Sequence, residues 1–311
     1  MAANKTRETL LDVRDLSVSF RMYDSNTLQQ TELRVIHDLS VSVREGEIVA
    51  VAGSSGSGKS LLAHAILGIL PGNALVSGAM LYRGEPVTET LLRKIRGREL
   101  AIVPQSLTYL DPLMKTGEQI NGIYGNDEKR RRIFERYELD ESAAKKYPFQ
   151  LSGGMSRRIL ISTALMGDAK LIIADEPTPG MTLATAKRVM EHFRELADGG
   201  AGILLITHDI DLAFECADRI AVFYAGSTVE IADAADFRAG PGHLRHPYSI
   251  ALWQAIPQNG FVPISGSQPY AGNLPSGCCF APRCPRRTGA CGLPVPMREF
   301  RGGEVRCVNA V

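Results

Sequence analysis

The sequence predicts an α/β fold, and two observations between residue 48 and about residue 235 support that prediction. Short apolar runs such as Leu171–Ala174 and Gly202–Ile206 have the composition of buried parallel strands. Between these two runs, apolar residues recur at helical spacing, as a crossover helix packed on a sheet requires. The residues of this stripe are Leu183, Ala186, Val189, Met190, Phe193 and Leu196.

The other elements continue the alternation of strands and helices. Ile48–Ala52 predicts a short, fully buried strand that is followed by a glycine-rich loop and an apolar helix. Arg219 to Asp233 predicts a β-hairpin that turns at residues 225–227. Charged residues crowd Asp127 to Lys146 with few strand signals, and we expect a helical insertion there, within a helical subdomain at about residues 106–165.

The amino-acid composition of the chain changes after Asp236. Prolines become frequent, and five of the six cysteines lie in this segment. We therefore predict two domains, residues 1–235 and a C-terminal extension at residues 236–311. Within the first we expect an antiparallel β region at the N-terminus.

Composition excludes some function classes. The chain of 311 residues carries 35 Lys and Arg against 34 Asp and Glu, so no overall basic field favours nucleic acid as a partner. No apolar run approaches the ~18–20 residues that cross a bilayer. We expect a soluble protein, whatever it docks onto.

The glycine-rich loop is the strongest functional signal. Its pattern GxxxxGKS lies between a predicted strand and a predicted helix, the context in which backbone N–H groups and a helix N-terminus cradle phosphates. In such a loop Lys59 would reach the β- and γ-phosphates, and the Ser60 hydroxyl would ligate Mg²⁺. The expected nucleotide contacts are Gly53, Ser54, Ser55, Gly56, Ser57, Gly58, Lys59, Ser60 and Leu61. The alternative, a glycine-rich turn with an incidental lysine, does not account for this context.

Two acids end the apolar run at Leu171–Ala174. Asp175 would join the Mg²⁺ shell, and Glu176 would polarise the attacking water. Alone, such a pair is equally typical of an ordinary strand end.

A second predicted helix N-terminus follows Leu151–Met155 and offers further free N–H groups. One nucleotide does not easily use two such sites from one chain. A dimer, in which this second site of each chain closes on the nucleotide of the other, resolves the redundancy.

Taken together, these motifs resemble the ATP-binding subunits of ABC transporters over nearly the whole chain. The loop at residues 53–60 corresponds to Walker A, and Leu171–Asp175 with Glu176 corresponds to Walker B and its glutamate. The signature motif is Leu151–Met155, with Ser152, Gly153 and Gly154 at the ATP of the partner chain. The resemblance further assigns the Q-loop glutamine to Gln105, the switch histidine to His208 and the adenine-stacking aromatic to Phe20.

The resemblance implies a mechanism and partners. Two ATPase subunits would enclose two ATP molecules between them. Glu176 would act as general base, and His208 would contact the γ-phosphate. Gln105 would sense the Mg²⁺ ion, which Ser60 and Asp175 would also ligate. Closure on ATP would drive two integral membrane permease subunits, and an extracytoplasmic binding protein would deliver the solute. The chain would then lie peripherally on the cytoplasmic face of the inner membrane, without a nucleic-acid partner.

Two regions are similar to the oligopeptide, dipeptide and nickel importers of this family. They are Gln105–Pro112 with Gly117–Ile120, and His246–Tyr248 with Gly277–Pro285. The resemblance implies uptake of peptides, nickel or a related small solute, and the sequence does not specify which.

The C-terminal cysteines suggest a metal site. Clustered cysteines in a cytosolic protein indicate metal ligands before disulfides. The resemblance implies a [4Fe–4S] cluster, and zinc would accept the same four thiolates. The expected ligands are Cys278, Cys284, Cys291 and Cys307, although Cys279 could replace Cys278. Free, buried thiols remain the alternative to a metal site. Cys216 lies in a predicted helix, and we expect it in the protein core.

Thr182 marks a departure from the family pattern. It occupies the slot where the family usually has an aspartate that crosses the dimer interface. A neutral residue there is either tolerated drift or the mark of a heterodimer with two unequal sites, which we favour.

A different class of function would also use an ABC-type module: a soluble ATPase that acts on nucleic acid or ribosomes. The sequence shows no basic stripe, coiled-coil insertion or second cassette, which disfavours that class. A simple P-loop kinase would not need Leu151–Met155.

Overall fold

The computed structural model describes residues 7–23, 29–122 and 125–311. Contacts divide the chain into two compact units. Unit 1 contains the described residues of Met1–Arg44, Val49–Val87 and His208–Val311, and unit 2 contains Glu45–Ile48 and Thr88–Thr207. None of the helices in the described ranges is both long and apolar enough to cross a membrane.

Unit 1 contains an antiparallel sheet in the order β2-β1-β4-β5. Its strands are β1 Thr9–Tyr23, β2 Gln30–Arg44, β4 Ala74–Tyr82 and β5 Glu85–Pro86. The register of β1 with β2 shifts near Asp15, whose φ of 47° marks an irregularity. The antiparallel N-terminal region that the sequence predicts is confirmed.

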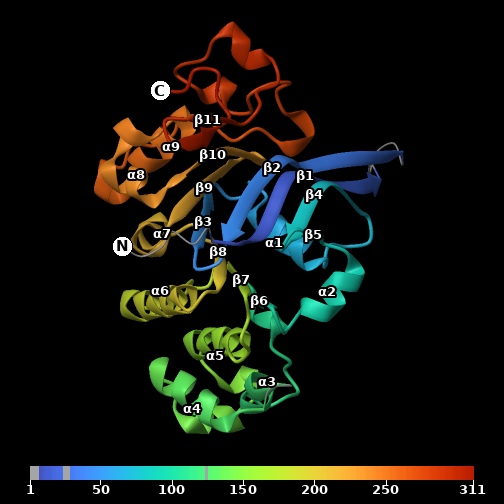
Figure 1. Ribbon diagram of the computed structural model, residues 1–311, viewed down its shortest axis with the longest axis vertical. Helices are drawn as coiled ribbons and strands as arrows, with labels where there is room; N and C mark the ends of the chain where they lie inside the picture. The colour runs from blue at the N-terminus through green and yellow to red at the C-terminus, as the bar shows by residue number, and fades with distance from the viewer. Residues whose placement is uncertain (1–6, 24–28, 123–124) are drawn as a thin grey trace. The chain divides into compact units, whose positions relative to one another are not determined.

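Unit 1 also carries strands in the order β11-β12-β10-β9-β3 (Figure 1). They are β3 Ile48–Gly53, β9 Arg219–Tyr224, β10 Ser227–Asp233, β11 Arg298–Phe300 and β12 Gly303–Val305. The predicted hairpin is confirmed, since β9 and β10 pair antiparallel around Ala225 and Gly226. Strand β3 pairs parallel with β9, so the P-loop begins from a fully buried strand.

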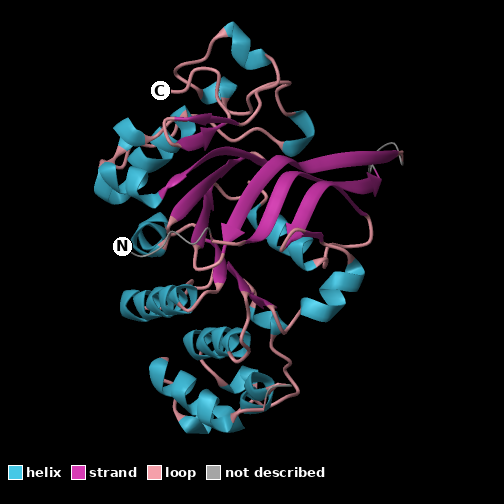
Figure 2. Ribbon diagram, viewed as in Figure 1, coloured by secondary structure: helices cyan, strands magenta, loops and turns pink. Residues whose placement is uncertain are grey.

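The helices of unit 1 are short. They are α1 Lys59–Leu67, α7 Ile210–Cys216, α8 Ala234–Ala239 and α9 Pro247–Gln254. Cys216 is buried in α7, as predicted. After α9 the C-terminal extension is mostly loop (Figure 2). Its 3-10 turns are Pro257–Asn259, Ala271–Asn273, Ala281–Arg283 and Gly289–Gly292.

Unit 2 is built on the parallel strands β6 Leu100–Val103, β7 Leu171–Asp175 and β8 Gly202–Ile206. Its helices are α2 Glu89–Ile95, α3 Thr116–Asn121, α4 Asp127–Arg136, α5 Gly153–Leu165 and α6 Leu183–Asp198. Helices α3, α4 and α5 lie together (Figure 1), so the charged region is helical as predicted. The helix between β7 and β8 is also confirmed. Two residues of the expected stripe are not buried: Leu183 is 65% exposed and Leu196 is half-buried.

Candidate nucleotide-binding site

The P-loop takes a shape that only glycine permits at two positions. Gly58 precedes α1 with a φ of 96°, in the left-handed region. Gly53 has a φ of 156°, and a Cβ atom there would lie 2.2 Å from the carbonyl oxygen of Phe223 in β9. The chain can therefore curl tightly between β3 and α1 and direct the first N–H groups of α1 toward an anion.

Lys59 is held inside this loop. Its ammonium donates to the carbonyl oxygens of Gly53, at 2.8 Å, and Ser54, at 3.0 Å. The side chain is only 8% exposed. The cation is thus placed at the loop by backbone dipoles. Ser60 and Leu61 continue into α1 as half-buried residues.

Two residues of the C-terminal extension contact the P-loop and were not predicted as site residues. The hydroxyl of Tyr248 accepts the N–H of Ser54 at 3.2 Å, and the Gln268 side chain accepts the Ser54 hydroxyl. The Gln268 amide nitrogen also lies 3.5 Å from the carbonyl oxygen of Gly56. The sequence marks Tyr248 only as part of a subfamily pattern, and it carries no signal for Gln268.

The acidic pair at the end of β7 has an unusual backbone. Asp175 is the last residue of the strand and is 3% exposed. Glu176 follows with a φ of 46°, a conformation that non-glycine residues rarely adopt. Its N–H donates to the carbonyl oxygen of Ile206 at 2.8 Å, which fixes the turn. Backbone strain of this kind is typical of functional positions, which makes Glu176 a candidate site residue.

Gln105 meets Glu176 directly in unit 2. Its amide nitrogen donates to the Glu176 carboxylate at 3.1 Å. The loop that carries Gln105 is itself held by Arg157 of α5, which donates to the carbonyl oxygens of Pro104, at 2.9 Å, and Gln105, at 2.6 Å. The pKa of Arg157 is lowered by burial, which outweighs the opposing effect of the Glu176 and Asp175 carboxylates. The structure therefore brings together two of the predicted catalytic side chains.

The segment Leu151–Met155 forms the start of α5. Ser152 is the N-cap, and its hydroxyl accepts the Met155 N–H at 3.3 Å. Gly153 and Gly154 form the first turn, and a Cβ atom at Gly153 would meet no atom within 4 Å. This open first turn leaves the backbone N–H groups accessible to an anion.

The last two predicted site residues lie in unit 1. Phe20 is half-buried in β1, opposite Leu33 of β2 and Ala74 of β4. His208 is exposed just before α7, whose N-cap is the neighbouring Asp209. The structure thus distributes the predicted site residues over both units.

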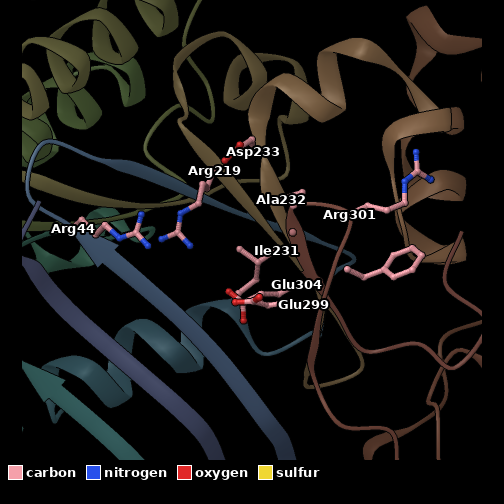
Figure 3. A pocket seen from close by; sticks show the side chains of 11 residues that line it. Arg44, Arg219, Ile231, Ala232, Asp233, Glu299, Arg301 and Glu304 are labelled. Carbon is pink, nitrogen blue, oxygen red and sulfur yellow. The ribbon is translucent and has the colours of Figure 1, made fainter. Parts of the chain in front are cut away.

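A separate hollow of about 490 Å³ lies on unit 1 along β10, β11 and β12. Figure 3 shows Glu299 and Glu304 side by side in it, with Arg44 and Arg219 together at one end. None of its eleven lining residues is a predicted site residue.

Four cysteines of the C-terminal extension form a cluster of interacting thiols. The pKa of Cys307 is raised to about 11 by burial and further by Cys278, Cys284 and Cys291. Burial likewise raises the pKa values of Cys278 and Cys284.

Backbone N–H groups point at these sulfurs. Thr288 donates to Cys291 at 3.5 Å, Arg286 to Cys284 at 3.4 Å and Asn309 to Cys307 at 3.3 Å. Cys279 interacts with Cys278 and with Ser227. Among the described residues, no three His, Cys, Asp or Glu side chains are placed to hold a single metal ion.

Comparison with known proteins gives the family. The family described as "ABC transporter" matches residues 36–179. The oligopeptide transport ATP-binding protein OppD of Escherichia coli (strain K12) is 33% identical over 325 residues, which cover 98% of this chain and 94% of that protein. The chain belongs to the ABC transporter ATP-binding family. The oligopeptide transport ATP-binding protein AppD of Bacillus subtilis (strain 168) is 34% identical over 324 residues, which cover 96% of this chain and 96% of that protein.

Two further comparisons concern the extension and the fold of this ABC-type ATPase. The family described as "Oligopeptide/dipeptide transporter, C-terminal region" matches residues 229–291. A solved dimeric structure of the ATP-binding cassette MJ0796, bound to ADP and Pi, is similar with a TM-score of 0.63 and 24% identity. It covers 72% of this chain and 99% of that one. The family resemblance and the ABC cassette fold that the sequence predicts are confirmed.

Proposed function

We propose that this ABC-type ATPase binds and hydrolyses ATP to power the import of peptides. The observation that carries the proposal is the similarity to oligopeptide transport ATP-binding proteins, which spans both the cassette and the extension. Nickel or another small solute is a second possible cargo, on the subfamily resemblance alone. A soluble ATPase that acts on nucleic acid is not favoured, because the relatives named above are transport subunits.

The side chains have distinct proposed roles. Lys59 and the N–H groups of the P-loop would bind the phosphates, and Ser60, Asp175 and Gln105 would complete the shell of Mg²⁺. Glu176 would accept the proton of the attacking water. Its strained backbone and its hydrogen bond from Gln105 support this role.

The remaining roles depend on assembly. Ser152, Gly153 and Gly154 would bind the nucleotide of a second ATPase subunit, with His208 at the γ-phosphate and Phe20 at the adenine. We propose a heterodimer, because Thr182 removes the charge that the family places at the interface. Two permease subunits and an extracytoplasmic binding protein would complete the importer, with this chain on the cytoplasmic face of the membrane.

Glu176→Gln tests the catalytic proposal. The amide keeps the shape of the side chain but cannot accept a proton, so ATP should bind while hydrolysis falls by a factor of about 100 or more. Steady-state phosphate release from the assembled complex and equilibrium ATP binding measure the two effects. Lys59→Ala serves as the matched variant, since it should weaken binding itself. Near-normal hydrolysis in Glu176→Gln would remove Glu176 from this role.

We also propose that the C-terminal thiols hold a [4Fe–4S] cluster, with zinc as the alternative. The chemistry of the donors suits either group, because the four thiols interact with one another and thiolates are the ligands that both groups take. The side chains would have to move closer together to surround a single zinc ion. The raised pKa values of Cys278, Cys284 and Cys307 show that burial disfavours their thiolates without such a partner. The backbone N–H groups at the sulfurs are donors that a bound cluster would use. Either group would cross-link the loops of the extension. We propose Cys278 as the fourth ligand, because it interacts with Cys284 and Cys291, whereas Cys279 interacts with Cys278 and Ser227.

Cys284→Ser tests this site. Anaerobically purified wild-type chain should be brown and carry roughly four iron and four sulfide, and the variant should be colourless. Cys216→Ser is the matched control, because Cys216 is buried in α7 outside the cluster. Zinc without iron would assign a zinc site instead. Metal-free wild-type protein with titratable thiols would contradict both versions.

A further inference from the structure

We infer that Tyr248 and Gln268 of the C-terminal extension are positioning residues for the P-loop and thereby set the affinity for nucleotide. The inference rests on the proposed ATP function. It assigns to the extension a direct part in nucleotide binding.

Ser54 is where the extension holds the P-loop. Its N–H donates to the Tyr248 hydroxyl at 3.2 Å, and its own hydroxyl donates to the Gln268 side-chain oxygen. Its carbonyl oxygen accepts the Ser57 N–H, at 3.2 Å, and the Lys59 ammonium, at 3.0 Å. All polar groups of Ser54 are therefore engaged, and two of its partners come from residues about 200 positions away in the chain.

These contacts influence the position of Lys59 through Ser54. The ammonium of Lys59 donates to the carbonyl oxygens of Gly53 and Ser54, which help to locate it. If the Ser54 peptide rotates, one of these acceptors moves with it. Gly56, with a φ of 76°, has an easily deformed backbone, and its carbonyl oxygen lies next to the Gln268 amide. Tyr248 and Gln268 thus restrain a segment that glycine leaves soft.

Packing and hydrogen bonds hold Tyr248 and the segment before Gln268 in place. Tyr248 is 1% exposed, and its ring packs on Tyr224, at a centroid distance of 4.5 Å, and on Phe280, at 5.3 Å. Arg283 fixes the segment that leads to Gln268, because it donates to the carbonyl oxygens of Ile264, at 2.9 Å, and Ser265, at 2.7 Å. The same guanidinium donates to the Tyr224 hydroxyl at 3.1 Å. One arginine therefore ties both restraining residues to a common support.

Tyr248→Phe and Gln268→Ala test the inference. Each removes one restraint on Ser54 and leaves the packing of the buried ring intact. We expect the Kd for a fluorescent ATP analogue to rise roughly threefold to tenfold in each variant, the range that one hydrogen bond supplies. The ADP analogue should weaken similarly, because the loop also holds the β-phosphate. In the assembled complex KM for ATP should rise while kcat changes little.

Matched controls separate positioning from general damage. Tyr270→Phe makes the same change at a tyrosine of the extension that is 69% exposed, and Gln254→Ala makes the other change in α9. Both should bind nucleotide as the wild type does. Ser54→Ala combined with Gln268→Ala should weaken binding by less than the product of the two single effects, because Gln268 acts through the Ser54 hydroxyl.

The outcomes distinguish the inference from the proposed function. Wild-type affinity in both Tyr248→Phe and Gln268→Ala, with binding impaired in Lys59→Ala, would overturn the inference alone. Independent effects of Ser54→Ala and Gln268→Ala would overturn the route through Ser54. A wild-type chain that binds no nucleotide, or unchanged binding in Lys59→Ala, would overturn the proposed function and the inference with it.

Discussion

His246 caps helix α9 with a ring that must stay neutral. Its Nδ1 accepts the Tyr248 N–H at 3.0 Å, so this nitrogen cannot carry a proton. The ring is 1% exposed, and burial lowers the pKa of His246 to about 3. The sequence indicates only that this histidine belongs to a subfamily pattern. Its role in the cap depends on burial, which no local pattern reveals.

The pKa of His246 predicts an acid-sensitive fold. Above the unfolded-state pKa of about 6.5, the ring is neutral in both the folded and the unfolded state, so its titration does not reduce the free energy of unfolding. As the pH falls from 6.5 toward 3, only the unfolded state gains the proton, so stability should decrease by about 2 kcal/mol between pH 7 and pH 5. Thermal denaturation across this range measures the loss. His246→Asn keeps a capping oxygen without the titration, and its melting temperature should depend less on pH. Equal pH dependence in both proteins would contradict this assignment.

Thr182 has a structural role at the scale of a helix. Its hydroxyl accepts the Thr185 N–H at 3.3 Å and caps α6. Threonine and aspartate are both good N-caps, so a threonine starts the helix as well as the aspartate that the family resemblance leads us to expect. The cap supports the interpretation of Thr182 as a tolerated substitution. The missing negative charge supports a dimer with two unequal ATP sites. Measurements of stability and of ATP hydrolysis distinguish the two interpretations.

Two substitutions at Thr182 make that measurement. Thr182→Ala should cost about 1 kcal/mol of unfolding free energy, because α6 loses its cap. Thr182→Asp should keep the stability of the wild type and restore the negative charge. If the dimer has unequal sites, Thr182→Asp should also raise ATP hydrolysis by the assembled complex. A stable Thr182→Ala would contradict the cap, and unchanged hydrolysis in Thr182→Asp would contradict the unequal sites.

The elements that the sequence predicts best are those with regular patterns. The apolar stripe of α6 and the turn of the β9–β10 hairpin are local signals, and both are confirmed. The extent of β1 is not predictable in this way. Its register shifts and the left-handed Asp15 interrupt the alternation of apolar and polar residues that marks a strand.

At the scale of the whole molecule, motif order located the candidate site but not its supporting contacts. The P-loop, the acidic pair and the signature segment each have a recognisable spacing, and the structure places them at a strand end or a helix start. Tyr248 and Gln268 lie 194 and 214 positions from Ser54. Hydrogen bonds over such separations arise from tertiary packing, which leaves no periodic trace in a single sequence.

Arg157 gives unit 2 a mechanical property. Its two hydrogen bonds join helix α5 to the loop of Gln105, and both acceptors are backbone atoms. These bonds couple the helix to the loop, so we expect a displacement of α5 at Ser152 to shift Gln105 and its hydrogen bond to the Glu176 carboxylate. We therefore expect the start of α5 and the Gln105 loop to change position together, with Glu176 affected by either.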